Sequence, residues 1–510
     1  MDERVGRVYL VGAGPGAPDL ITVRGEQILR SAEVVVYDYL VSPELLALAP
    51  PDAELLYAGK KGGDGGNIGQ AELNRILIEH ARAGRRVVRL KGGDPFIFGR
   101  GGEEAEALVA AKIAFEVVPG VTSATAAPAF AGIPLTHRKL ASFVAFLTAH
   151  QDETKSGQRN AVAWDELASA AKAGGTLVLL MASAALRDSL ARLARQLPAT
   201  TPAAVVQWAT TAAQRSIVAT IATLADEVER AGVGAPSVVV IGEAAALGPQ
   251  LNWFERMSLY GRRIVITRAR EASSSFAAGL RALGAEVVEF PTIETLAPDS
   301  YATIDAALEH VASFDWIIFT SATGVERLLE RMRTRGVDLR AMAGAKLGAI
   351  GPVTAARLAA HALIVAALPH EYRAEAIIEA IGAQHIRGAR ILIPRAQVAR
   401  EVLPEMLMAA GACEVVAAPV YKTVKPRLAP IERVREMANA GAIDLVAFTS
   451  SSTVTNFCEM VGAGAARGLR AAVIGPVTGD TARAAGLEIV VQPREYTVAA
   501  LTDAIRDFFR

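Results

Sequence analysis

Residues 90–104 read LKGGDPFIFGRGGEE and follow directly on an apolar run, RRVVRL. An apolar run that breaks into glycines is typical of a buried parallel strand entering a ligand-binding loop at the carboxyl edge of an α/β sheet. Glycines there let backbone N–H groups approach a ligand closely, and Asp94 can accept hydrogen bonds from ligand hydroxyls. A plain strand-to-helix turn would not need so constrained a string, so the segment predicts an α/β fold with a ligand site at this strand end.

The same pattern recurs along the chain. Short β-rich apolar runs alternate with helical stretches, as in VYLVGAG, EVVVYDYL, FEVVPG, FVAFLTAH and TLVLLM. This alternation predicts parallel α/β layers. The length of 510 residues suggests about three or four domains.

Composition argues against several classes of protein. Lys and Arg (53) balance Asp and Glu (53), so no net field attracts nucleic acid. No apolar run approaches the roughly 20 residues of a membrane span, and the first residues lead into a strand without a signal-peptide pattern. Cys413 and Cys458 make neither a disulfide framework nor a thiolate metal site, and no histidine stands in an HExxH motif. We expect a soluble cytoplasmic protein without metal, membrane or nucleic-acid partners.

A break in the pattern near residue 258 divides the chain into two halves. The strand–helix alternation is lost over 247–262, where Trp253 and Phe254 indicate a packed junction, and a fresh strand, RIVITRAR, follows. The second half repeats itself: DWIIFTSATGV and AIGPVTAARLA are matched later by DLVAFTSSSTV and VIGPVTGDTARAAG. Matching motifs in matching order predict two related α/β lobes with a cleft between their strand-end loops.

A second glycine-rich loop follows the first strand and leaves one alternative open. Residues 12–17, GAGPGA, fit the relaxed dinucleotide pattern, and Asp38 lies near the spacing of a ribose carboxylate, as in NAD-dependent oxidoreductases. Pro15 and Pro18 argue against this reading. They stand where a pyrophosphate-binding helix should donate backbone N–H groups, and proline has none.

A family resemblance explains these motifs better. GAGPGAPDLITVRG, VVVYDYLVSPE, LKGGDPFIFGRGGEE, VVPGVTSATAAPAFAGIPLTHR and VVVIGE, in this order, resemble uroporphyrinogen-III C-methyltransferase of the tetrapyrrole methylases over residues 5–256. The resemblance implies two α/β domains, 1–120 and 121–248, and then a linker, 249–261. It also implies a homodimer through this half and S-adenosylmethionine bound between the domains. The implied reaction methylates two ring carbons of uroporphyrinogen III to give precorrin-2.

The family's site residues carry over position by position. The implied cofactor contacts are Pro15, Gly92, Gly93, Asp94, Ile97, Thr122, Ser123, Met181 and Ala209. Asp38 matches the carboxylate usually proposed as proton acceptor, and Lys60 matches the proposed proton donor. The physics agrees, because an electron-rich pyrrole carbon needs mainly positioning against the methyl group and a carboxylate near the ring N–H groups can take a proton. The alternatives are a turn or N-cap role for Asp38 and a solvated surface lysine for Lys60.

The implied substrate is rich in carboxylates, so a neutral protein must gather cations locally. Cations lie in or beside the motif loops: Lys60, Lys61, Arg89, Lys91, Arg100, His137, Arg138 and Lys139. Arginine suits forked contacts with carboxylates. We predict substrate contacts for Arg100, His137 and Arg138, with a packed loop histidine as the alternative for His137.

Some positions depart from the family pattern. Leu180-Met181-Ala182 stands where Tyr-Met-Gly is usual, and Ala149 and Ala209 also replace glycines. Where the backbone needs a positive φ, alanine is strained. These departures leave open a tetrapyrrole-binding or regulatory protein that retains only one activity.

Residues 262–510 resemble uroporphyrinogen-III synthase through IVITRAR, DWIIFTSATGV, AIGPVTAARL, VYKTV, AFTSSSTV and VIGPVTGDTARAAG. The resemblance implies lobe one from 262–291 plus 424–510, and lobe two from 292–423, joined by a two-stranded ladder at EFPTIET and AAPVYKT. It implies that linear hydroxymethylbilane loses hydroxide and cyclises with inversion of its last pyrrole. That reaction needs no cofactor.

The second half has its own predicted site. Tyr421 matches the tyrosine proposed in that family to help the leaving group. The predicted substrate contacts are strand-end residues and the IGP-x-T loop: Thr320, Ser321, Thr449, Ser450, Gly475, Pro476 and Thr478. A helix N-cap is the alternative for each Ser or Thr, and a packed linker side chain for Tyr421. We expect a bifunctional enzyme that closes the linear tetrapyrrole and then methylates the product; a methyltransferase acting on a later corrin intermediate is the alternative.

Overall fold

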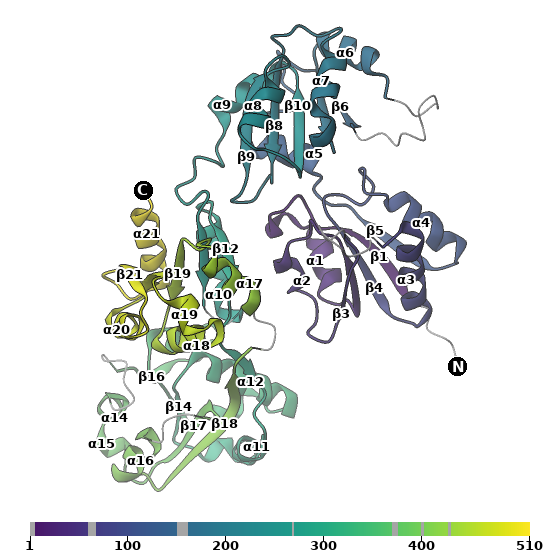
Figure 1. The fold of residues 1–510 in the computed structure, drawn as a ribbon. Helices are drawn as coiled ribbons and strands as arrows, with labels where there is room; N and C mark the ends of the chain where they lie inside the picture. Colours follow the sequence, from purple (N-terminus) through teal and green to yellow (C-terminus); the bar gives the residue numbers. More distant parts are fainter. Residues whose placement is uncertain are drawn as a thin grey trace.

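The computed structural model describes residues 6–59, 68–149, 162–267, 270–369, 376–398, 402–426 and 430–510, with side chains of 270–274 excepted. Within these ranges the strands form four sheets. Figure 1 shows the first two sheets with their helices at the right and top, and the other two stacked at the lower left. Lys60 and Lys61, two of the predicted cations, lie outside the described residues.

The first sheet is entirely parallel, in the order β3-β2-β4-β1-β5. Its strands are β1 (Arg7–Gly12), β2 (Val34–Tyr37), β3 (Glu54–Tyr57), β4 (Arg86–Lys91) and β5 (Ala114–Val118). Its helices are α1 (Val23–Leu29), α2 (Pro43–Leu46), α3 (Gln70–Arg82) and α4 (Gly101–Ala110). Alternate strand residues pack on opposite faces, Leu10 against α3 and α4 and Val11 against α1 and α2, so helices cover both faces and the ligand edge stays open.

The second sheet corrects the prediction of parallel layers. Its order is β6-β7-β10-β8-β9, and only the β6–β7 pair is parallel. Its strands are β6 (Phe143–Thr148), β7 (Gly175–Leu180), β8 (Pro202–Gln207), β9 (Arg215–Thr220) and β10 (Ser237–Ile241). Its helices are α5 (Ser123–Phe130), α6 (Trp164–Lys172), α7 (Leu186–Leu193) and α8 (Leu224–Arg230). Only residues 208–214 join β8 to β9, too few for a parallel crossover, which needs about a dozen.

The junction between the halves packs against the second-sheet unit. After α9 (Gly248–Leu251), the indole N–H of Trp253 donates to the carbonyl of Ala129 at 3.0 Å. Phe254 is 7% exposed, with its ring 5.0 Å from that of Phe130 and 5.6 Å from that of Tyr260. The aromatic pair therefore anchors this segment, as the sequence indicated.

The third sheet joins the beginning and the end of the second half. It is parallel throughout, in the order β12-β11-β19-β20-β21. Its strands are β11 (Arg263–Ile266), β12 (Glu286–Glu289), β19 (Leu445–Phe448), β20 (Arg470–Val473) and β21 (Glu488–Val491). Its helices are α10 (Arg270–Arg281), α17 (Ile431–Asn439), α18 (Ser451–Val461), α19 (Ala463–Ala466), α20 (Pro476–Ala484) and α21 (Val498–Phe508).

The fourth sheet has the order β13-β18-β17-β14-β15-β16 and is parallel except at its first pair. Its strands are β13 (Glu294–Leu296), β14 (Trp316–Phe319), β15 (Lys346–Ala349), β16 (Val365–Ala367), β17 (Arg390–Ala396) and β18 (Glu414–Val424). Its helices are α11 (Ala302–Glu309), α12 (Ala322–Arg335), α13 (Pro352–Ala359), α14 (Ala376–Ile381), α15 (Ala383–Ile386) and α16 (Val402–Ala409). The antiparallel pair sets Glu294 opposite Val424, so the two crossings between the sheets lie side by side.

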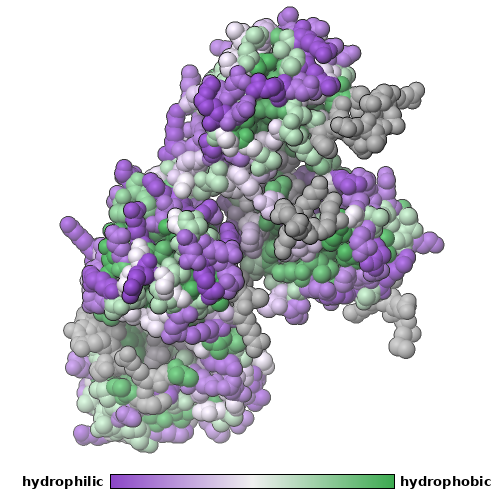
Figure 2. Space-filling model, in the orientation of Figure 1, coloured by the Kyte–Doolittle hydropathy of each residue, from purple (hydrophilic) through white to green (hydrophobic). Residues whose placement is uncertain are grey.

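Short 3-10 helices complete the described elements: η1 (Pro18–Leu20), η3 (Ser183–Ala185), η4 (Glu243–Leu247), η5 (Val311–Ser313) and η6 (Leu339–Met342). In the part of the chain that is described, no helix is both long and apolar enough to cross a membrane. On the face drawn in Figure 2, hydrophobic residues reach the surface in scattered patches between hydrophilic ones.

Candidate functional site

Three glycine-rich loops cross at the carboxyl edge of the first sheet. The N–H of Gly93 donates to the carbonyl of Gly14 at 2.7 Å, and the return bond is 3.3 Å long. A Cβ on Gly120 would lie 2.2 Å from the carbonyl oxygen of Gly93 and 2.6 Å from the Cα of Gly12. No side chain fits at such distances, so this crossing requires glycine. The structure thus brings together the loops after β1, β4 and β5.

Asp94 fastens this crossing rather than standing free beside it. One carboxylate oxygen accepts from the N–H groups of Phe96 at 2.8 Å and Ile97 at 3.1 Å. The other accepts from the N–H of Gly120 at 3.0 Å. Asp94 was predicted to accept from ligand hydroxyls; in the structure it ties its own loop to the loop after β5. Ile97 is exposed in the same loop.

The N-terminus of α5 lies next to the crossing. A Cβ on Gly93 would lie 3.9 Å from the Cα of Thr122 and from the backbone nitrogen of Ser123. The hydroxyl of Thr122 caps α5 by accepting from the N–H of Ala124 at 3.3 Å. These distances place the start of α5 at the same edge as Gly92 and Gly93.

The loop after β1 also reaches across to the second-sheet unit. The N–H of Ala17 donates to the hydroxyl of Thr210 at 3.0 Å, and a Cβ on Gly16 would lie 3.1 Å from the carbonyl of Ala209. Pro15 lies in this bridging loop. No helix begins directly at the loop, because η1 comes first and α1 starts at Val23. That geometry does not match the dinucleotide alternative, which needs a helix N-terminus there.

The glycine-to-alanine departures carry no backbone strain. Ala182 has φ −90°, and neither Ala149 nor Ala209 has a positive φ. At the 207–211 loop the left-handed conformation falls instead on Trp208, with φ 45°, and Thr210, with φ 68°. Met181, with φ 54° and a side chain that is half exposed, follows β7 on the second-sheet unit.

Asp38 stands at the end of β2 and is held by a buried charge network. It accepts from the guanidinium of Arg89 at 2.6 Å. Arg89 also lies 3.2 Å from Glu104, whose same oxygen accepts from Lys91 at 2.7 Å. Asp38 is not an N-cap, since Ser42 caps α2, and its side chain keeps 30% of its exposure.

This network accounts for Arg89 and Lys91, two of the cations that lie in or beside the motif loops. Each is only 3% exposed, and both pair with Glu104, which is 1% exposed. Burial, together with the charge of Arg89, lowers the pKa of Lys91. The sequence held a signal for this outcome: VVRLK is a central strand, and a central parallel strand is buried on both faces.

The three predicted substrate cations are spread over surface turns. Arg100 is exposed and forms a forked pair with Glu103 at 2.7 and 2.9 Å. His137 pairs with Ala141 in a tight backbone bridge, and its ring nitrogen lies 3.2 Å from the N–H of Lys139. Its ring therefore supports a turn, which favours the packed alternative, while Arg138 is exposed.

In the second half, the repeated motifs form repeated helix starts. Ser321 caps α12 by accepting from Gly324 at 3.0 Å, and Ser450 caps α18 by accepting from Thr453 at 3.4 Å. Gly475 precedes Pro476 at the start of α20, as Gly351 precedes α13. Both serines thus take the N-cap alternative. Thr478 is 5% exposed, so its side chain is buried rather than open to a substrate.

One contact joins two of the predicted synthase residues. The hydroxyl of Tyr421, on β18, lies 3.1 Å from the hydroxyl of Ser321. Thr320, at the end of β14, is exposed, whereas Thr449 and Ser450 are partly exposed at the end of β19 in the other sheet. The structure therefore places the predicted residues at strand ends of both sheets, and it pairs Tyr421 with the fourth-sheet set.

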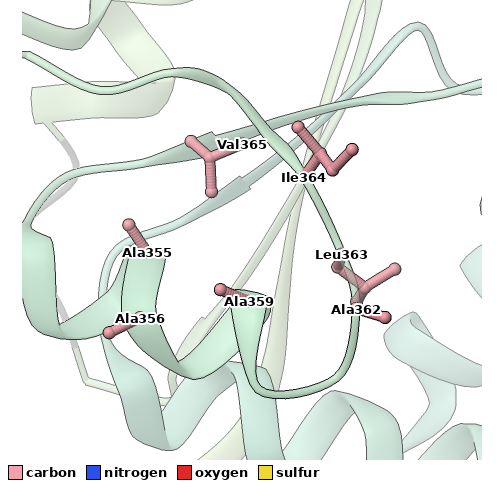
Figure 3. A pocket seen from close by; sticks show the side chains of 7 residues that line it. All are labelled: Ala355, Ala356, Ala359, Ala362, Leu363, Ile364 and Val365. Carbon is pink, nitrogen blue, oxygen red and sulfur yellow. The ribbon is translucent and has the colours of Figure 1, made fainter.

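An apolar pocket in the second half adds no catalytic group to the candidate sites. A pocket of about 470 Å³ lies between α13 and the segment that leads into β16 (Figure 3), lined only by apolar side chains: Ala355, Ala356, Ala359, Ala362, Leu363, Ile364 and Val365. It offers no acid, base or hydroxyl. Among the described residues, no group of three or more His, Cys, Asp or Glu side chains is placed to hold a metal ion.

Similarity to known proteins decides the family. The family model described as "Tetrapyrrole (Corrin/Porphyrin) Methylases" matches residues 7–225, and the one described as "Uroporphyrinogen-III synthase HemD" matches 274–503. The "Porphyrin biosynthesis protein HemD" of Ruminiclostridium josui is 34% identical over 501 residues, which cover 98% of this chain and 97% of that protein. The chain belongs to this family of methylase–synthase fusions. The predicted fusion and its α/β fold are therefore confirmed.

Other relatives match the methylase half alone. The "S-adenosyl-L-methionine-dependent uroporphyrinogen III methyltransferase" of Methanosarcina barkeri is 47% identical over 248 residues, covering 48% of this chain and 95% of that protein. A solved structure of uroporphyrin-III C-methyltransferase from Thermus thermophilus, complexed with S-adenyl homocysteine, is 38% identical with a TM-score of 0.39, covering 47% of this chain and 93% of that one.

Proposed function

We propose that the synthase half cyclises hydroxymethylbilane to uroporphyrinogen III, and that the methylase half methylates this product twice with S-adenosylmethionine to give precorrin-2. The observation that carries the proposal is the crossing of Gly12, Gly93 and Gly120 at the sheet edge where Asp38 follows β2, in a chain of which 98% is similar to a porphyrin biosynthesis protein. The product of one half is the substrate of the other, which gives the fusion a chemical rationale.

The chemistry of the residues at the glycine crossing suits a polar cofactor held by backbone groups. Backbone rather than side chains forms the crossing, and the backbone nitrogen of Ser123 at the start of α5 lies beside it. Ile97 and Met181, both partly exposed, offer apolar contact from the first- and second-sheet units. When bound, S-adenosylmethionine supplies an electrophilic methyl group to the pyrrole carbon.

Asp38 is the acid–base group of the proposed methyl transfer. Its carboxylate is fixed by Arg89 yet keeps an exposed edge. Methylation of a pyrrole carbon leaves a proton to be removed from the ring system, and a carboxylate held near the ring N–H groups can orient them and accept that proton. Lys60, the proposed donor, lies outside the described residues and stays a prediction.

In the synthase half, Tyr421 is the proposed donor to the departing hydroxide. Its hydroxyl lies 3.1 Å from that of Ser321, which holds the phenol at the strand edge of the fourth sheet. The loops at the helix starts of Ser321, Gly351, Ser450 and Gly475 are the proposed contacts for substrate carboxylates. The proposed role of the protein is to hold the reactive chain so that its last pyrrole inverts before ring closure.

We extend the proposal to a homodimer through the methylase half. Large apolar side chains are exposed beside its ligand edge: Tyr39, Leu40, Phe96 and Phe98. Large exposed apolar side chains of this kind are compatible with an interaction surface. Light scattering of the full chain would give the mass of two copies, and a monomer would contradict this part of the proposal. Cytoplasmic location stays a prediction.

One assay tests both activities. The full chain is supplied with hydroxymethylbilane, with and without S-adenosylmethionine, and the tetrapyrrole is identified by mass and isomer. A gain of two methyl groups with S-adenosylhomocysteine released is expected. Uroporphyrinogen III without methylation would leave only the synthase, and type I isomer without methylation would overturn both assignments. Asp38→Asn and Tyr421→Phe serve as paired controls, because each should impair one step and spare the other.

A further inference from the structure

Thr210 holds a backbone conformation that its residue type disfavours. It is β-branched, has φ 68°, and is 4% exposed. A positive φ is an outlier for such a residue, and it persists only where the surrounding structure over-determines it. The hydroxyl of Thr210 is also the group that accepts the N–H of Ala17 and so links the two methylase sheets.

Gln214 is the residue that holds Thr210 in place. It is 1% exposed, and its side-chain oxygen accepts the N–H of Thr210 at 2.9 Å. Its amide nitrogen donates to the carbonyl of Phe130 at 3.2 Å and to Glu255 at 3.0 Å. Both sides of the amide are therefore occupied, and these acceptors fix which side faces Thr210.

The other end of this chain of hydrogen bonds lies in the junction between the two halves. Glu255 also accepts from the hydroxyl of Ser216, and its own N–H is capped by Asn252. The hydroxyl of Tyr260 donates to the backbone carbonyl of Gln214. Burial, with the charge of Glu255, raises the pKa of Tyr260 to about 12, so it remains a donor at neutral pH.

The junction is in turn fastened to the synthase half. The N–H of Leu259 donates to the carbonyl of Leu283 at 2.8 Å, and Leu259 is fully buried in the core around β11 and α10. A continuous path of contacts thus runs from the loop after β1, through Thr210 and Gln214, to Glu255 and the first core of the synthase.

We propose that Gln214 and Glu255 are positioning residues of the methylase site. Through them, the junction between the two halves contributes to methyl transfer. The inference rests on the proposed function, because it takes the loop of residues 207–211 to be part of the cofactor site. Without Glu255, the amide of Gln214 keeps only the carbonyl of Phe130 as its acceptor, and its orientation toward Thr210 is held less firmly. Thr210 then relaxes from its left-handed conformation and releases Ala17.

The test uses Glu255→Ala in the full chain, with S-adenosylhomocysteine binding measured by calorimetry and methylation of supplied uroporphyrinogen III by steady-state kinetics. The dissociation constant and the KM for S-adenosylmethionine should each rise about tenfold, as expected when a buried donor loses its acceptor, with a smaller change in kcat. Glu255→Gln should restore both, since its amide oxygen still accepts from Gln214 and Ser216. Glu243→Ala, at an exposed acid before the junction, is the matched control and should change neither.

The outcomes separate the inference from the proposed function. A wild-type chain that neither binds S-adenosylhomocysteine nor methylates would contradict the proposed function. A competent wild type with an unchanged dissociation constant and KM in Glu255→Ala would overturn only the positioning role. Should that variant unfold, Tyr260→Phe removes one hydroxyl alone: weaker binding with an unchanged unfolding midpoint supports the inference, and wild-type binding overturns it.

Discussion

The candidate site of the methylase half is formed mainly by backbone, whereas the residues proposed for the synthase half include hydroxyl side chains at helix starts. Gly12 and Gly120 approach so closely that a methyl group on either would push the loops apart. Ser321 and Ser450 instead each cap their own helix, in two different sheets. A substitution at the crossing should therefore disturb several loops at once, whereas the loss of one N-cap should affect mainly its own helix.

The strongest test of this contrast is Gly120→Ala. The added Cβ would lie 2.2 Å from the carbonyl of Gly93, so the loops must separate by an ångström or more. Misplacing a site by about 1 Å costs roughly a hundredfold in rate, and we expect methylation of uroporphyrinogen III to fall at least that far. Synthase activity on hydroxymethylbilane should be unchanged. Gly102→Ala, where a Cβ meets nothing within 4 Å, is the control; equal losses in both variants would refute the steric argument.

The buried charges beneath the crossing give the next largest effect. Glu104→Ala would leave Arg89 and Lys91 buried without their shared partner, which costs about 3–5 kcal/mol. Glu103, its neighbour, is exposed and pairs with Arg100, so Glu103→Ala should cost at most about 1 kcal/mol. Urea unfolding followed through the methylase half measures the difference. Similar unfolding midpoints for the two variants would contradict the role of Glu104.

The region changed in these two variants also shows which features of the site could be predicted from the sequence. Apolar runs ending in glycines predicted the loops at the carboxyl edge, because parallel strands bring their ends together. The sequence could not reveal that Asp94 would turn toward backbone N–H groups, since its spacing serves a ligand or its own loop equally well. The prediction of parallel strands was wrong for most of the second sheet, because apolar runs such as those of β8 and β10 suit parallel and antiparallel neighbours alike.

Contacts between residues far apart in the chain also could not be predicted from the sequence. Gln214 was not among the predicted site residues. Its proposed role depends on hydrogen bonds with Thr210, Phe130 and Glu255, which come together only in the folded chain. The helix caps were foreseen as alternatives, because a Ser that follows an apolar strand and opens a helix is a common N-cap. The spacing of the repeated motifs could not predict which of the two N-cap serines also contacts Tyr421.

In the synthase half, Tyr421→Phe should have the largest effect. It removes the hydroxyl that lies 3.1 Å from Ser321 while keeping the ring. Loss of a proton donor in the transition state typically costs about a hundredfold or more, so formation of uroporphyrinogen III should slow and type I isomer should accumulate. Methylation of supplied uroporphyrinogen III should not change. Tyr301→Phe, whose ring packs under Arg331 in the same lobe, is the control, and an equal loss there would point to packing instead.

The smallest effect comes from the two serine caps, which the internal repeat makes a matched pair. Ser321→Ala and Ser450→Ala each remove an N-cap, and each should cost about 1 kcal/mol of stability. Only Ser321 also touches Tyr421, so Ser321→Ala should slow ring closure by a further few-fold while Ser450→Ala slows it less. Thermal unfolding and the rate of uroporphyrinogen III formation, measured on both variants, separate the two roles. Equal rates with equal stabilities would mean that Ser321 acts as a cap alone, and that Tyr421 is held by its strand rather than by its partner.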